Sequence, residues 1–249
     1  MKKYWSTCLL YSLFIQLITL PSHAQPVSRL TSSYEIGVGW NDKAVLINGQ
    51  YHQYLKIDRR GFLQVGWGLG ASHLRGRELD FTTAPAQLTK GKTGFAALNA
   101  PTLLRQIDTL QMKTGITSFN FAISAQLSLF ERVDLGANVD LLGFALGARR
   151  AGLYLSSKGY NKVDSLNLHR TYQQARPARF NFLLLGDNTR GNLNTELYAR
   201  IHIVPQVSLK ISYLFTTGEY RTEQLLTDDN RRFRYRSPLL FVGLTFPID

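Results

Sequence analysis

The stretch that decides the fold is Ser118 to Leu141, which reads SFNFAISAQLSLFERVDLGANVDL. In two runs, from Phe119 to Leu129 and from Val133 to Leu141, every second residue is apolar, and Phe130-Glu131-Arg132 joins them. A period of two predicts β-strands with one apolar and one polar face. Runs of about ten residues exceed the usual soluble strand and match what a tilted strand needs to cross a bilayer. The stretch therefore predicts two strands of a membrane β-barrel.

Alternation alone leaves open which face points inward. A soluble barrel, such as a lipocalin-like binder, buries its apolar face, whereas an outer-membrane barrel turns that face toward lipid. The polar face from Ser118 to Ser128 carries only small or neutral residues. Such residues suit the narrow interior of a barrel of about eight strands. We therefore expect the apolar face to contact lipid, with the soluble binder as the alternative.

The N-terminus has the features of an export signal. Lys2 and Lys3 precede an apolar stretch that ends at Leu20, and Pro21-Ser22-His23-Ala24 offers small residues to a signal peptidase. An uncleaved anchor is the alternative, but polar residues interrupt the stretch and leave it short for a spanning helix. We expect cleavage after Ala24, which makes residues 1–24 a signal peptide and residues 25–249 one barrel domain.

Composition narrows the chemistry of the mature chain. The sequence has one cysteine, Cys8, so cleavage would remove thiolate nucleophiles, disulfides and cysteine–zinc sites. The formal charge of +12 would fall to +10 with the loss of Lys2 and Lys3. In an exported protein this charge favours anionic surface groups over nucleic acid as partners. No motif indicates a cofactor or a metal: Gly91-Lys92-Thr93 lacks the first glycine of a phosphate-binding loop.

Alternating runs recur along the rest of the chain. The predicted strands number eight, and three of their connections are tight while others are long, at residues 74–115, 148–191 and 218–232. Short turns at one end and long loops at the other are typical of outer-membrane barrels. The strands are expected at residues 34–40, 45–57, 63–72, 118–129, 133–146, 193–203, 207–216 and 240–246.

At this point the chain resembles the small eight-stranded outer-membrane β-barrel proteins of Gram-negative bacteria. The resemblance covers residues 31–246 and rests on the signal peptide, the alternation and the closing pattern Leu240-x-Val242-x-Leu244-x-Phe246. It implies an all-β, antiparallel, up-and-down transmembrane barrel in the outer membrane. It also implies that the barrel-assembly machinery recognises Leu240, Val242, Leu244 and Phe246. The chain departs from the class in its tail, Pro247-Ile248-Asp249, because the aromatic residue is usually terminal.

Charged residues on the polar strand faces are expected to form an interior network, because buried charges must be paired. Its predicted members are Glu35, His52, Asp134, Asp140, Glu196, Arg200, His202 and Lys210. The best catalytic candidates are Ser72 and His73, with Asp80 beyond them. Adjacent residues of a strand point to opposite faces, which argues against a shared proton. We therefore expect no catalytic site here, with a lipid-modifying enzyme on the same barrel as an alternative.

The long loops concentrate basic residues, which we expect to contact lipopolysaccharide phosphates or other anionic surface groups. The residues expected to do so are Arg75, Arg77, Lys90, Lys92, Arg149, Arg150 and Lys158. The sequence thus predicts a monomeric outer-membrane barrel with a structural or surface-interaction role and no cofactor. An ordinary solvated loop surface explains the charge equally well.

Overall fold

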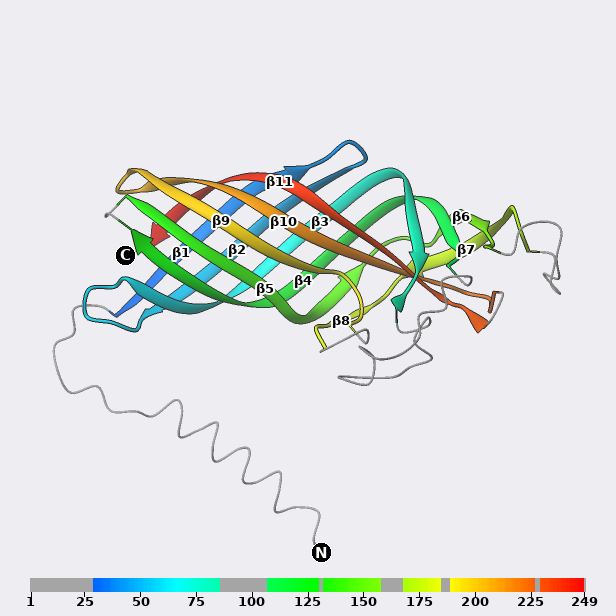
Figure 1. Cartoon of the computed structure of the whole chain (residues 1–249), viewed down its shortest axis with the longest axis horizontal. Helices are drawn as coiled ribbons and strands as arrows, with labels where there is room; N and C mark the ends of the chain where they lie inside the picture. The colour runs from blue at the N-terminus through cyan, green and yellow to red at the C-terminus, as the bar shows by residue number, and fades with distance from the viewer. Residues whose placement is uncertain are drawn as a thin grey trace, which may run out of the picture.

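A computed structural model describes residues 29–85, 107–129, 132–157, 168–184, 189–226 and 229–248 of the protein (Figure 1). The predicted signal peptide, residues 1–24, lies outside these residues, so its cleavage stays a prediction. No helix in the described part of the chain is long and apolar enough to cross a membrane.

Eight strands form a closed antiparallel barrel, which confirms the predicted fold. Each pairs with the next along the ring, and β1 pairs with β11, from Ser32↔Ile248 to Trp40↔Leu240, to close it. Figure 1 shows these strands running side by side along the long axis of the molecule. They are β1 (Leu30–Trp40), β2 (Ala44–Lys56), β3 (Leu63–Thr83), β4 (Thr109–Leu129), β5 (Val133–Leu146), β9 (Leu193–Val204), β10 (Val207–Thr222) and β11 (Arg232–Ile248).

Beyond the end that carries the long connections, here called the outer end, the barrel narrows to a ring of six strands. Strands β3, β4, β10 and β11 continue past the others, and β6 (Arg150–Leu155) and β7 (Thr171–Pro177) join them. The pairings β3–β4, β4–β6, β6–β7, β7–β10, β10–β11 and β11–β3 close this second ring. A short strand, β8 (Phe180–Phe182), instead pairs with β5.

The second ring corrects the prediction that residues 74–115, 148–191 and 218–232 are irregular. Parts of all three segments are strand, and in the first of them a β-bulge interrupts the sequence pattern. Arg77 and Glu78 together oppose Lys113, with Glu78 at φ +53°. The extra residue moves the inward positions of β3 from even to odd numbers, so the period of two breaks at that point.

The outward face of the eight-stranded ring is apolar. Ile123, Leu135, Leu197 and Tyr213 point away from the barrel, with 42–62% of their surface exposed. The neighbouring residues on each strand point inward and are buried. An exposed apolar outer wall is the arrangement of an outer-membrane β-barrel and the reverse of a lipocalin-like binder. The predicted facing of the strands is therefore correct.

The interior has two halves of different chemistry. Toward the short turns it is polar and charged, but toward the outer end it is an apolar core. The core continues from the eight-stranded ring into the six-stranded one, where Tyr154 of β6 and Ala175 of β7 join it. Its members include Leu46, Leu74, Leu79, Phe81, Leu110, Met112, Ile116, Tyr154, Leu214, Tyr220, Phe233, Leu239 and Phe241.

The apolar core also settles the facing of the last strand, which the sequence left uncertain. Leu239 and Phe241 point inward and are buried, 1% and 0% exposed. The intervening Leu240, with Leu244 and Phe246, points toward lipid. Both faces of β11 are apolar because one contacts lipid and the other contacts this core.

Candidate functional site

The charged half of the lumen is organised around Lys210. Its ammonium nitrogen lies 2.7 Å from Glu35 Oε1 on β1 and 2.7 Å from Glu196 Oε2 on β9. Asn138 Nδ2 also donates to Glu196 Oε2, at 2.9 Å. All three charged side chains are almost completely buried, so each depends on the others to offset the cost of leaving water.

Arg200 extends this network toward the short turns. Its Nη1 lies 3.0 Å from Gln126 Oε1 and 3.6 Å from Asp134 Oδ2, and its guanidinium lies 5.2 Å from the ring centre of Tyr198. Its Nε and Nη2 are buried without a hydrogen-bond acceptor in the described chain. A polar cavity of about 230 Å³ adjoins Arg200 and has room for water, the usual partner of such groups.

Two further predicted lumen residues bind neutral groups. A ring nitrogen of His52, Nε2, lies 2.9 Å from Gln50 Oε1. Asp140 Oδ2 accepts hydrogen bonds from Asn120 Nδ2 at 2.7 Å and from the backbone nitrogen of Asn194 at 2.8 Å. The side chains that form these hydrogen bonds and the ion pairs occupy the inner half of the barrel.

A chain of Ser, His and Asp lies at the short-turn end of the lumen. Ser208 Oγ lies 2.8 Å from His202 Nδ1, and His202 Nε2 lies 2.9 Å from Asp134 Oδ2. All three residues line the 230 Å³ cavity. The sequence predicted His202 and Asp134 as members of the lumen network, whereas Ser208 was not among the predicted members. The tight turn after β9 contained the signal, because it sets Ser208 opposite His202.

The catalytic candidates from the sequence do not come together. Ser72 points into the lumen, where Asn194 Nδ2 lies 3.4 Å from its hydroxyl. His73 is exposed on the outer wall and lies 2.9 Å from Thr117 Oγ1. Asp80 forms an exposed ion pair with Lys43 at 3.2 Å. The strand geometry that argued against a Ser72–His73 pair is present in the structure.

The predicted anion-binding residues are partly described. Arg75 and Arg77 belong to β3 rather than to a loop, and both are exposed. Arg149 Nη2 lies 2.7 Å from Glu223 Oε2, and Arg150 begins β6 with its Nε buried. Three more of the predicted residues, Lys90, Lys92 and Lys158, lie outside the described residues.

Glu219 of β10 is a buried carboxylate above the apolar wall. It holds the backbone at Gly191 and two arginines of β11 together at the outer end, an arrangement here called the Glu219 clamp. Glu219 accepts hydrogen bonds from Arg232 Nε at 2.8 Å, from Arg234 Nη2 at 3.0 Å and from the backbone nitrogen of Gly191 at 3.3 Å. Burial by itself would raise the pKa of Glu219, but the hydrogen bonds and charges of Arg232 and Arg234 lower this pKa below its ordinary value. The clamp therefore keeps its charge at neutral pH.

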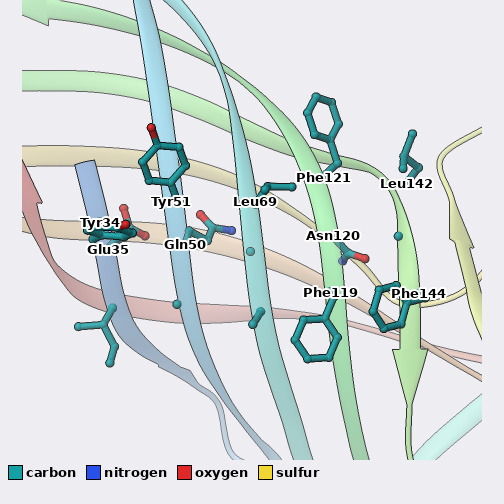
Figure 2. A pocket seen from close by; sticks show the side chains of 15 residues that line it. Tyr34, Glu35, Gln50, Tyr51, Leu69, Phe119, Asn120, Phe121, Leu142 and Phe144 are labelled. Atoms are coloured by element: carbon teal, nitrogen blue, oxygen red, sulfur yellow. The ribbon is translucent and has the colours of Figure 1, made fainter. Parts of the chain in front are cut away.

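An apolar depression of about 670 Å³ lies over the outer wall of β1–β5. Figure 2 shows its aromatic residues, with Tyr34 and Tyr51 on one side and Phe119 and Phe144 on the other. Gly49, which has only a hydrogen as its side chain, and Ala71 also line the depression. Because this wall faces the membrane, the depression lies against lipid, and most of the surface that it presents is apolar.

Among the described residues, no three His, Cys, Asp or Glu side chains are grouped to hold a metal ion. No protein-family model matches the chain, and no curated protein matches it.

Several solved structures are similar to this chain at low sequence identity. The outer membrane protein Ail of Yersinia pestis, in a phospholipid nanodisc, shares 8% identity, with 88% of this chain and 99% of Ail covered and a TM-score of 0.38. Neisserial surface protein A shares 9% (88% and 97% covered, TM-score 0.37). A major outer membrane protein of Thermus thermophilus shares 12% (88% and 99% covered, TM-score 0.37). The assignment of the fold therefore rests on the strand pairing and facing of this chain.

Proposed function

We propose that the protein is an outer-membrane barrel of the cell surface whose cationic outer end binds anionic groups of the outer leaflet, chiefly lipopolysaccharide phosphates. One observation carries the proposal: exposed arginines stand directly above the apolar wall. Arg75 lies on the same outward face of β3 as Trp67 and Leu69, only a few residues farther along the strand. Guanidinium groups at this height meet lipid phosphates and bind them through paired hydrogen bonds.

The interior supports a surface role over a transport role. The apolar core fills the outer half of the barrel, and paired charges fill the inner half. An eight-stranded barrel leaves little more room than its side chains need. With the outer half of the lumen filled, a ligand outside the cell meets the outer surface of the molecule.

The test is the amount of lipopolysaccharide phosphate that co-purifies with the folded barrel across a salt series. Replacing Arg75 and Arg77 by Glu should lower this amount at low salt, and the difference should shrink as salt screens the charges. The matched control replaces Arg59 and Arg60 by Glu, which makes the same charge change at the short-turn end. Equal loss in both variants, or no loss in either, would contradict the proposal.

Assembly is part of the proposal. Leu240, Val242, Leu244 and Phe246 form the outward face of β11 beside the closing strand β1, and we propose that the barrel-assembly machinery reads them in a barrel that works as a monomer. Replacing Phe246 by Ala should slow assembly in cells and leave refolding of the purified chain in detergent unchanged. Normal assembly of this variant in cells would show that the barrel-assembly machinery does not need Phe246.

A second candidate function, hydrolysis of an ester, is favoured by the Ser208–His202–Asp134 chain. Asp134 orients the imidazole so that Nδ1 takes the proton of Ser208 while Oγ attacks an acyl carbon. The imidazolium then protonates the departing alcohol, and water releases the acyl group from Ser208. A fluorophosphonate should label the folded protein and fail to label the Ser208→Ala variant. Absence of labelling in the unaltered protein would eliminate this candidate.

A further inference from the structure

A second feature of the outer end is a cavity that neither the sequence nor the proposed function assigns. Where the barrel narrows from eight strands to six, the wall steps inward above β8 and β9. A cavity of about 680 Å³ lies on this step, between the ends of β7, β8, β10 and β11. Six arginines line it and define what we call the arginine ledge: Arg176, Arg179, Arg190, Arg221, Arg231 and Arg232.

The two carboxylates of the cavity are already engaged. Glu219 binds Arg232 and Arg234, as described above. Glu223 lies 2.7 Å from Arg176 and 2.7 Å from Arg149. Each carboxylate thus faces two guanidinium groups, so neither neutralises the other arginines of the ledge.

The remaining arginines lack an acidic partner in the described part of the chain. Among those residues, Arg179, Arg190 and Arg221 form no ion pair. Arg231 donates from Nη2 to the backbone oxygen of Glu223 at 2.8 Å, while its Nε is buried without an acceptor. Uncompensated cations around one cavity repel each other, and an anion that enters relieves the repulsion.

The shape and height of the cavity narrow the choice of anion. Guanidinium groups bind phosphate in paired, planar contacts, and several around one site favour a multiply charged oxyanion. The volume exceeds that of a bare phosphate, and Phe180, Pro177 and Ala178 supply an apolar wall. Phe180 pairs with Phe144, which belongs to the lipid-facing wall, so the cavity opens at the level of the headgroups.

We propose that the arginine ledge binds a phosphate monoester carried on a saccharide. This inference rests on the proposed surface role and specifies one site for it. Two sources have this chemistry: a phosphorylated glycolipid headgroup of the outer leaflet, and a soluble sugar phosphate. The height of the cavity favours the lipid source.

The test measures binding by calorimetry to the folded mature chain in nanodiscs of zwitterionic lipid. The probe is glucosamine 1-phosphate, and the control ligand is glucosamine, which lacks the phosphate. The phosphorylated sugar should bind saturably. Replacing Arg190 and Arg221 by Gln should weaken its Kd at least tenfold, because neither arginine serves an ion pair of the described fold. The matched control, Arg59→Gln with Arg60→Gln, removes the same charge from exposed positions at the short-turn end and should leave Kd unchanged.

A second arm adds diphosphorylated lipid A to the nanodiscs. If it blocks the binding of glucosamine 1-phosphate, the headgroup occupies the arginine ledge; if the sugar phosphate still binds, the ligand is a soluble one. Absence of saturable glucosamine 1-phosphate binding would overturn the proposed phosphate site at the arginine ledge. Equal weakening of its Kd by both pairs of substitutions would overturn the site too. The proposed surface role has its own test in the Arg75 and Arg77 charge reversal, so the two can fail separately.

Discussion

At the scale of single residues, the Lys210 ammonium holds together two carboxylates that would otherwise repel each other inside the lumen. Replacing Lys210 by Met leaves Glu196 buried without a cation and Glu35 with only the more distant Arg200, 3.9 Å away. Removing one partner of a buried ion pair typically costs about 3–5 kcal/mol. We therefore expect the free energy of unfolding, measured with urea in lipid vesicles, to fall by about this amount.

A combined variant distinguishes lost pairing from lost packing at this position. Adding Glu35→Gln and Glu196→Gln to Lys210→Met removes the stranded charges and should restore most of the stability. No recovery in the combined variant would show that the cost came from packing around the Lys210 stem.

The Glu219 clamp predicts a pH dependence at the outer end. Its pKa is lower in the folded chain than the ordinary carboxyl value of 4.5. A lowered folded pKa stabilises the clamp fully above the ordinary value, and this contribution disappears as pH falls through the folded value. Hydrogen-exchange protection of the Gly191 amide, which donates to Glu219, should therefore drop below about pH 4.5. An unchanged pH profile in the Glu219→Gln variant would contradict this cause.

At the scale of elements, the facing of β4 gives a graded prediction. Ile123 lies near the middle of the lipid-facing wall, opposite Trp67 and Val139. Replacing Ile123 by Arg should cost about 2–4 kcal/mol of folding free energy, as a cation does near the bilayer midplane. The control is Gln111→Arg on the same outward face above the wall, near the native Lys113, with an expected cost of about 0–1 kcal/mol. Equal losses of folding free energy for the two variants in urea titrations would contradict the lipid-facing position of Ile123.

The strands within the membrane could be predicted from sequence because lipid and lumen impose opposite polarity on alternate residues. The same rule failed where both sides of a strand are apolar or where a bulge shifts the period. At Leu239 and Phe241 the apolar core hides the alternation, and at Arg77–Glu78 the bulge reverses it. The lumen residues were predictable one by one, whereas their partners depend on the ring closure.

The arginine ledge could not be predicted from the sequence, because its composition also depends on how the strands close into a ring. Its residues come from three separate segments around residues 176–190, 221 and 231–232, and only the six-stranded ring brings them together. Local patterns predicted that the outer segments are basic, but not which arginines share a cavity or which already have a carboxylate.

At the scale of the whole molecule, the apolar core and the charged network together seal the barrel. We therefore expect the purified protein to give no stable unitary conductance in planar bilayers. Reproducible large current steps would require a wider barrel than the strand pairing allows.

The central claim is that the apolar outer wall contacts lipid, and the two tryptophans of residues 25–249, Trp40 and Trp67, report on it directly. Both lie on this wall, 43% and 37% exposed. The Trp40→Phe variant isolates Trp67, which is paired with Ile123 in the middle of the wall. In vesicles of lipid brominated on its acyl chains, Trp67 fluorescence should be strongly quenched, while aqueous acrylamide should quench it weakly. Strong quenching by acrylamide and none by brominated lipid would contradict the membrane-facing barrel.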